Sequence, residues 1–366
     1  MTIHPVPAFD VRNPAQAVEA LPYLLGFQPD RPEGMVFVLT YDTLRERPLF
    51  SQKLTLPRDV EDPTETANDL LHTTMHRLEE FSTGPTSILL YLCANAEDAR
   101  DGHNAMRQHR GLADALILSA ETHGVDVLGV TFVTPTHWWA YHDRNPHYRS
   151  EGMPVDGPDN PGPVTANALA FGIPTPPSGA KIAAAFEPVT GTDADTHRAA
   201  IREAVSLRAE RVQDSSFDAE TQRLTAILDR LLLNGGDGTP LTDLTPEQTA
   251  ELIVGLRHRP LRDVALGYIA PNELARAREL WAMLARRCAS DSTTFVAPPL
   301  TLAGFAAAVA GEIPAALIAT ERARTVDPRY LLAELLMEQI VMTGSVKDLA
   351  DVVREQREDR LRGRDN

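Results

Sequence analysis

Three histidines and an aspartate lie close together in one segment that is rich in Pro, Gly, Asn and Asp. Imidazole nitrogens and carboxylate oxygens are ligands that zinc-like ions accept in groups of three or four. The candidate metal ligands are His142, Asp143 and His147, with His137 nearby. Spacing within a loop does not force side chains to converge, so the alternative is a set of ordinary surface histidines. No cofactor is predicted.

Aromatic side chains interrupt the same segment. Trp138 and Trp139 are consecutive, and Tyr141 follows two residues later. Consecutive side chains of an extended chain point to opposite faces, so one tryptophan would anchor the segment on the core. The other, with Tyr141, would form an exposed platform for a ligand or a partner. A pure packing role for both rings is the favoured interpretation.

The aromatic segment directly follows one of three apolar runs that predict buried strands, at 35–41, 87–93 and 125–133. Helical patterns separate these runs, which favours parallel pairing. In open α/β sheets, ligands bind beyond the carboxyl ends of parallel strands. The predicted ligand-binding residues at this crevice are Asp42, Asn95, Thr134, His137, Trp138, Trp139, Tyr141 and His142.

Helices that cover the sheet are signalled by capping residues and apolar periodicity. Pro14 begins and Gly26 ends a helix over 14–25, and Asp62 caps one that begins at Pro63. Further helices are predicted over 104–121, 164–171 and 179–186, and a long irregular loop over 135–163. The alternating pattern of 50–56 predicts a half-exposed edge strand that forms an antiparallel hairpin with the strand at 35–41. The fold class predicted for residues 1–190 is an α/β domain with a mostly parallel sheet of three to five strands and flanking helices.

The strand signal ends after the polar segment 188–196, which reads as a domain boundary. Helical patterns then run to the end of the chain, over 197–213, 217–233, 246–257, 272–288, 299–310, 313–326, 328–341 and 346–361. Residues 191–366 are therefore predicted to form an all-α domain of helical hairpins. Its tetratricopeptide-like character is partial, because Leu300, Gly304, Ala316 and Ala323 match that repeat whereas the next period does not.

Charge and composition exclude several classes of protein. The 366 residues carry a formal net charge of −16, and a chain without a dense basic stripe is a poor general ligand for nucleic acids or anionic membranes. The two cysteines, Cys93 and Cys288, imply no disulfide framework. The N-terminal residues do not resemble a signal peptide, which favours a cytoplasmic location. Phosphate-binding loops and serine-hydrolase motifs are absent.

Several short segments resemble an uncharacterised actinobacterial family, DUF4192. They are LPYLLGFQPD at 21–30, MVFVLT at 35–40, the tryptophan pair with EGMPV at 151–155, and LWAMLARRC at 280–288. The resemblance spans nearly the whole chain and implies an actinobacterial cytosolic protein with no known active site. It also implies cysteines between the tryptophans and Glu151 in relatives, and 140–150 holds none here.

The sequence favours a cytosolic protein-binding or regulatory module, because stacked helical hairpins present grooves and an acidic surface would select a basic protein partner. The alternative is an enzyme or sensor that binds a small molecule or metal at the strand-end crevice and the 134–147 loop. No catalytic signature decides between them, and the oligomeric state is left open.

Overall fold

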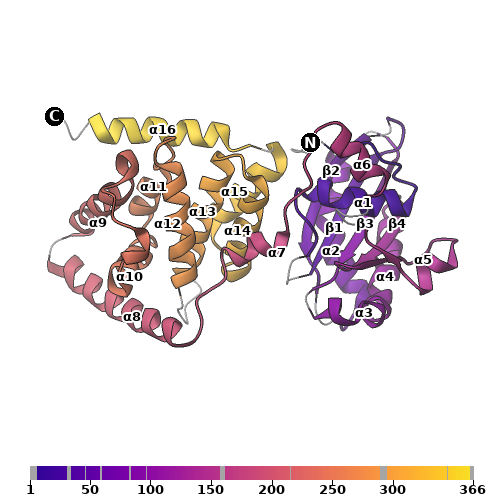
Figure 1. The fold of residues 1–366 in the computed structure, drawn as a ribbon, viewed down its shortest axis with the longest axis horizontal. Coiled ribbons are helices and arrows are strands. Elements are labelled where there is room, and N and C mark those ends of the chain that lie inside the picture. Colours follow the sequence, from indigo (N-terminus) through magenta and orange to yellow (C-terminus); the bar gives the residue numbers. More distant parts are fainter. Residues whose placement is uncertain are drawn as a thin grey trace. The chain divides into compact units, whose positions relative to one another are not determined.

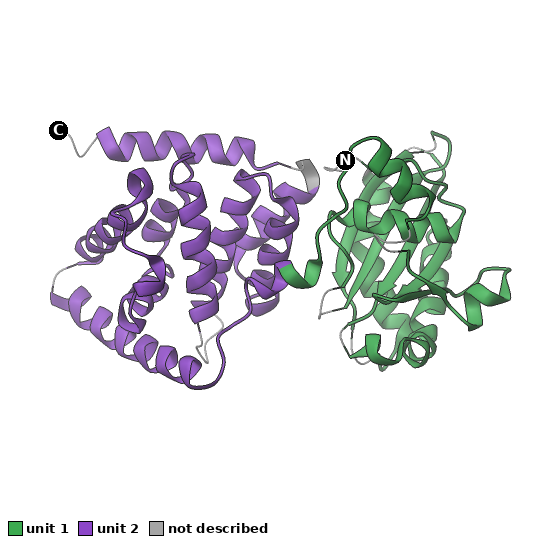
Figure 2. Cartoon of the chain, in the orientation of Figure 1, with its two compact units in different colours: residues 1–181 green, residues 182–366 purple. Residues whose placement is uncertain are grey.

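The chain folds into two compact units, residues 1–181 and residues 182–366, each with its own core (Figure 2). The computed structural model describes residues 6–30, 34–45, 47–57, 60–81, 84–95, 97–156, 161–214, 216–288, 295–343 and 345–362. The first unit is built on a β-sheet and the second is helical, as predicted.

The sheet of the first unit has six strands in the order β2-β1-β3-β4-β5-β6. The strands are β1 (Met35–Asp42), β2 (Arg47–Thr55), β3 (Thr86–Cys93), β4 (Asp126–Val133), β5 (His137–Ala140) and β6 (Met153–Pro154). Only β3 and β4 pair in parallel; every other neighbouring pair is antiparallel.

The sheet is therefore mixed, and the prediction of a mostly parallel sheet of three to five strands was wrong. The reason is the β1–β2 hairpin, which reverses the chain before the first long helix. That helix consequently joins β2 to β3, two strands that run in the same direction with β1 between them. Strands joined through a helix do run in the same direction, as β2 and β3 do and as β3 and β4 do. By contrast, β1 is joined to β2 by a hairpin, so β1 runs the opposite way.

Helices cover both faces of the sheet (Figure 1). One face packs against α2 (Pro63–Phe81), α3 (Gly102–Gln108) and α4 (Arg110–Thr122), whose apolar residues share a core with Val38, Leu90 and Phe132. The other face lies under α1 (Pro14–Leu25), where the Tyr91 hydroxyl donates to the carbonyl of Ala17 at 3.0 Å. Against α1 packs α6 (Pro163–Ala170). The helix predicted over 104–121 is in fact broken at His109.

The segment predicted as an irregular loop, 135–163, contains regular structure. It adds β5 and β6 to the sheet and carries the short helix α5 (Pro146–Ser150) between them. Asn145 caps α5, and its side chain accepts from the backbone N–H of His147 at 3.1 Å. Strand signals this short are hard to see in a sequence rich in turn formers, which is why the pattern favoured a loop.

The second unit consists of α-helices and short 3-10 turns within its described residues. The helices are α8 (Gly191–Asp214), α9 (Phe217–Leu232), α10 (Pro246–Gly255), α11 (Arg259–Leu266), α12 (Leu274–Arg287), α13 (Ala297–Val309), α14 (Ile313–Val326), α15 (Leu331–Thr343) and α16 (Lys347–Arg362). Buried on nearly all sides, α13 is the centre of the unit. A Cβ at Gly304 would lie 2.5 Å from Thr320 Oγ1, so glycine lets α13 and α14 approach closely.

Two features of this unit differ from the pattern in the sequence. The polar segment 188–196 is not all linker, because α8 begins at Gly191. The helix α11 was not predicted, since its RPLRDVAL sequence is short and contains a proline, although that proline stands in the first turn, where it is tolerated. In the part of the chain that the structure describes, no helix combines the length and apolarity needed to cross a bilayer. The short helix α7 (Gly179–Ala184) lies where the units meet along the chain.

Candidate functional site

Asp42 does not lie at the predicted strand-end crevice. It pairs with Thr86, the first residue of β3, so it lies at the amino end of β3, opposite to the carboxyl ends of β3 and β4. Its carboxylate accepts from the backbone N–H groups of Leu44 and Arg45, both at 3.0 Å, and forms an ion pair with the Arg45 guanidinium at 2.7 Å. The Arg45 hydrogen bond lowers the pKa of Asp42. Asp42 thus closes the β1–β2 turn, and its place in the predicted site was wrong.

Asn95 and Thr134 do follow the carboxyl ends of the parallel pair, as predicted, but their side chains are used within their own turns. The Asn95 amide oxygen accepts from the N–H groups of Glu97 and Asp98, both at 2.8 Å. The Thr134 hydroxyl donates to the His137 carbonyl at 2.9 Å and accepts from its N–H at 2.9 Å. Both residues therefore shape the backbone at the strand ends.

A hydrogen-bonded cluster that the sequence pattern did not reveal joins Asn95 to Asp98 and to the buried His109. Asp98 accepts from the Asn95 amide at 2.8 Å, and its carboxylate lies 3.2 Å from His109 Nε2. The His109 ring stacks on Phe132, with 5.6 Å between centroids. This arrangement ties the α3–α4 break to the strand end, which makes it a structural link between elements.

The aromatic pair is buried on both sides of the sheet. Trp138 and Trp139 are only 3% and 4% exposed, and Tyr141 is 1% exposed. Trp139 belongs to the core under α2 and α4, whereas Trp138 packs against Tyr148 of α5, 5.0 Å between centroids. The Tyr141 hydroxyl donates to the Met106 carbonyl at 2.8 Å. The packing interpretation fits, and the exposed aromatic platform was wrong.

The candidate metal ligands are not brought together. His142 Nε2 lies 2.9 Å from Asp114, and His147 Nδ1 lies 2.9 Å from Glu151. The Asp143 carboxylate accepts from the backbone N–H of Asn145 at 2.7 Å, and the exposed His137 ring contacts Thr136. Throughout the described ranges, no three His, Cys, Asp or Glu side chains are placed to hold a metal ion.

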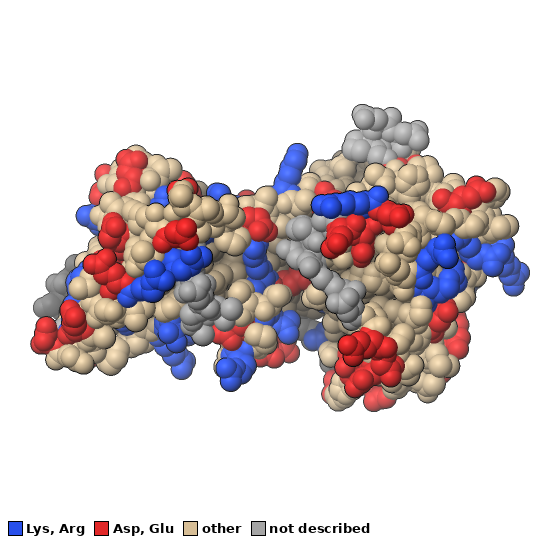
Figure 3. Space-filling model, turned by 90° about the horizontal axis from the view of Figure 1, so that it is seen from below, with Lys and Arg blue, Asp and Glu red and all other residues tan. Residues whose placement is uncertain are grey.

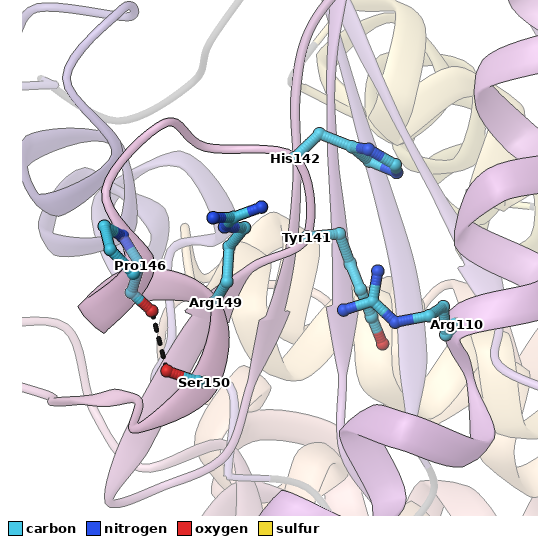
Figure 4. Close-up of a pocket in the computed structure, with 6 residues that line it drawn as sticks. All are labelled: Arg110, Tyr141, His142, Pro146, Arg149 and Ser150. Carbon is cyan, nitrogen blue, oxygen red and sulfur yellow. Dashed lines mark hydrogen bonds between the residues drawn. The ribbon is translucent and has the colours of Figure 1, made fainter.

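A pocket of about 360 Å³ does lie beside two of the predicted residues, Tyr141 and His142. Its size is within the range of small-molecule sites. Figure 4 shows Arg110 reaching in from α4 and Arg149 from α5, with Tyr141 and His142 on the chain that leaves β5. Pro146 and Ser150 of α5 complete the lining, and the Ser150 hydroxyl donates to the Pro146 carbonyl at 2.8 Å.

The pocket is basic. The Arg110 guanidinium carbon lies 5.3 Å from the centroid of the Tyr141 ring. Among the described residues, neither Arg110 nor Arg149 has a carboxylate within ion-pair distance. Burial raises the pKa of Tyr141, so its ring stays neutral beneath the cation. Basic side chains gather at the α5 end of the first unit in Figure 3. The pocket is therefore suited to an anion.

The arginines were missed in the sequence because neither belongs to a motif. Arg110 follows the helix break at His109, and Arg149 lies in a five-residue helix inside the predicted loop. The sequence holds no specific signal for them, because eleven arginines are spread over residues 1–180 and Arg110 is distant in sequence from the aromatic segment.

The fold and the pocket define a two-unit protein in which a mixed α/β sheet unit with a basic surface pocket precedes a helical unit. The chain belongs to the DUF4192 family, a domain of unknown function, whose family model matches residues 14–344. No curated protein and no solved structure matches the chain.

Proposed function

We propose that the first unit binds an anionic ligand in the α4–α5 pocket and that the protein acts as a regulatory or binding module in the cytoplasm. The observation that carries the proposal is the pair of guanidinium groups, Arg110 and Arg149, which face one pocket without a carboxylate partner among the described residues. Arginine donates paired hydrogen bonds that match carboxylate and phosphate oxygens. A ligand that carries either group is the expected class.

Titration with inorganic phosphate and with citrate, followed by isothermal calorimetry, tests this proposal. A hydrogen bond to a charged group contributes about 1.5 kcal/mol or more, so Arg110→Gln and Arg149→Gln should each weaken binding about tenfold. Arg144→Gln is the matched control, because it removes the same charge from an exposed residue outside the pocket lining. Equal affinity in all four proteins, or no binding of either anion, would remove the anion-binding function.

A second candidate function is the recruitment of a protein partner by the helical unit. It is favoured by Leu331 and Leu335, which are 61% and 51% exposed and lie one turn apart on α15. Their spacing gives α15 an outward apolar stripe of the kind that helical-hairpin stacks use for recognition. The tetratricopeptide-like matches of α13 and α14 support the same view.

Native mass spectrometry of the full chain, isolated gently from its host, tests partner recruitment. We expect a complex whose mass is lost with the double variant Leu331→Gln, Leu335→Gln and is retained with Leu118→Gln. Leu118 is an equally exposed leucine (58%) in the first unit. Retention of the complex in the double variant would exclude the α15 stripe as the binding surface.

A further inference from the structure

The last helix is held to the second unit in an unusual way. Ten of the sixteen residues of α16 are charged, and only Ala350 and Val353 are buried. Figure 1 shows α16 lying along one edge of the unit, across the ends of α11 and α12. A helix with so small an apolar face gains little from the hydrophobic effect. Its position must depend on other contacts.

Those contacts are two arginines, one turn apart, on the inner face of α16. Arg357 pairs with Glu273, and Arg360 lies 3.5 Å from Asp229. Both guanidinium carbons also lie near the Tyr268 ring, at 6.0 and 5.9 Å from its centroid. The Arg357 side chain passes over Gly267, where a Cβ would be 3.5 Å from the Cβ and Cδ atoms of Arg357.

The floor of this contact is an acidic groove formed by other elements of the unit. Glu273 is 1% exposed, and it also accepts from the Asn234 N–H at 3.0 Å. The Tyr268 hydroxyl donates to Asp229 at 2.7 Å, which fixes that carboxylate. Pro260, Val264 and Gly267 form the α11 wall, with a cavity of about 220 Å³ left beneath α16. We name this the acidic groove, and it is defined by Asp229, Glu273, Tyr268 and the α11 wall.

The fit between α16 and the acidic groove is incomplete. Three buried polar atoms have no hydrogen-bond partner within the described part of the chain: Glu273 Oε2, Arg357 Nε and Arg360 Nη2. Buried ion pairs also lose much of their Coulomb energy to desolvation, so imperfect ones contribute little net stability. Release of α16 would return the two carboxylates to water and would not leave them as buried, unpaired charges.

The family match ends at residue 344, just before α16 begins at Lys347. The acidic groove therefore lies inside the region that defines the family, whereas its occupant lies outside that region. We propose that the acidic groove is a docking site for a partner helix that carries an apolar residue followed by two arginines one turn apart. In this structure α16 occupies the site in cis as a releasable, autoinhibitory pseudo-ligand. The inference is independent of the basic pocket and of the α15 stripe.

The test compares two double variants of the full chain that remove the same charge. Arg357→Gln, Arg360→Gln removes the inner arginines, whereas the control Arg354→Gln, Arg362→Gln removes outer arginines whose ion pairs, among the described residues, lie within α16. Hydrogen exchange by mass spectrometry should show α16 amides exchanging at least tenfold faster in the first variant and little changed in the control. The α12 and α13 amides should remain protected in both.

Binding is then measured by fluorescence anisotropy with a labelled synthetic peptide of residues 345–362 as the probe. We expect the inner-arginine variant to bind this peptide at least tenfold more tightly than the unaltered chain, and the added change Glu273→Gln to abolish that gain. A released α16 without peptide binding would overturn the docking site. Equal exchange of the α16 amides in both double variants would show that the inner arginines do not hold α16, and would overturn the proposal.

A second way of releasing α16 guards against damage to the fold. Val353→Asp places a charge on the buried side of α16 without altering the acidic groove. It should reproduce the faster exchange and the peptide binding. If both Val353→Asp and the inner-arginine variant unfold α12 and α13 as well, then α16 is an integral part of the core and the proposal is wrong.

Discussion

Gly152 shows why the tryptophan pair belongs to the core. Its φ of +74° is a backbone conformation that favours glycine. A Cβ at this position would lie 2.5 Å from the ring of Trp139. The chain that leads into β6 therefore closes directly over the indole, and the ring has no free face to offer a ligand. Tryptophan often recognises ligands, but here Trp139 packs against the chain that joins β5 to β6.

His197 is a buried titratable group whose protonation should affect stability. It lies in the first turns of α8, where burial and the nearby Arg287 lower its pKa below the ordinary value of 6.5. The unfolded chain then binds the proton at a higher pH than the folded chain does. Since the unfolded state holds more protons in that window, the free energy of unfolding must fall as the pH drops below about 6.5.

We predict that His197→Gln makes the unfolding free energy less sensitive to pH between about 7 and 5. Urea denaturation of the full chain at several pH values measures this slope. His103→Gln is the control, because His103 is exposed. Identical slopes for the His197 variant and the unaltered chain would show that its proton uptake is not linked to folding.

At the scale of elements, one buried carboxylate joins α1 to α6. Glu19 of α1 accepts from the backbone N–H of Val164 at 3.0 Å and of Thr165 at 2.7 Å, at the start of α6. A charged acceptor at a helix N-terminus satisfies N–H groups that have no partner within the helix and interacts favourably with the helix dipole. A Cβ at Gly162 would lie 2.6 Å from the Glu19 carboxylate, so glycine is required for this approach.

Glu19→Gln should lower the free energy of unfolding of the first unit by about 1–2 kcal/mol, because the hydrogen bonds lose their charge assistance while the shape is kept. Chemical denaturation monitored by circular dichroism measures the change. Glu121→Gln removes an exposed carboxylate from the same unit and should have little effect. A loss of stability as large in the control would mean that overall charge, and not the α6 cap, is responsible.

The helices and long strands were predictable because their signals are local. Pro14 and Gly26 mark both ends of α1 in the sequence and in the structure, and the structure adds Asn13 as the N-cap. The antiparallel β1–β2 hairpin was predicted and is confirmed, but its effect on the direction of β1 was missed. The helix after the hairpin joins β2 to β3, so β1 runs antiparallel to β3 and Asp42 lies at the opposite end of the sheet from the carboxyl ends of β3 and β4. Likewise, β5 forms by pairing with β4, and β6 forms by pairing with β5, and sequences of four and two residues do not encode such pairing by themselves.

The residues of the candidate site also divide into those with a local signal in the sequence and those without one. Tyr141 and His142 were predicted because they follow a strand, and both line the basic pocket. Arg110 and Arg149 were not, because the pocket forms only when the end of β5 is placed between α4 and α5. Convergence of residues from three elements is a tertiary property, and no spacing in the sequence reports it.

At the scale of the whole molecule, the formal charge of −16 is opposite in sign to the basic pocket and the same in sign as the acidic groove. The basic pocket is a local exception on an acidic chain, so its anion must be held by short-range contacts. The acidic groove shares the sign of the whole chain, so long-range attraction would steer a basic helix toward it, and that association should slow as salt is added.

The two edges of the sheet have a consequence for the behaviour of the protein in concentrated solution. One edge is β2, which carries Pro48 and Lys53, and the other is β6, which has two residues, one of them Pro154. Proline cannot donate to a strand ladder, and charged or very short edges discourage strand addition by another chain. Both borders of the sheet are thereby closed to cross-β growth. The apolar strands between them are therefore kept from pairing with a strand of another chain, which is the first step of cross-β aggregation.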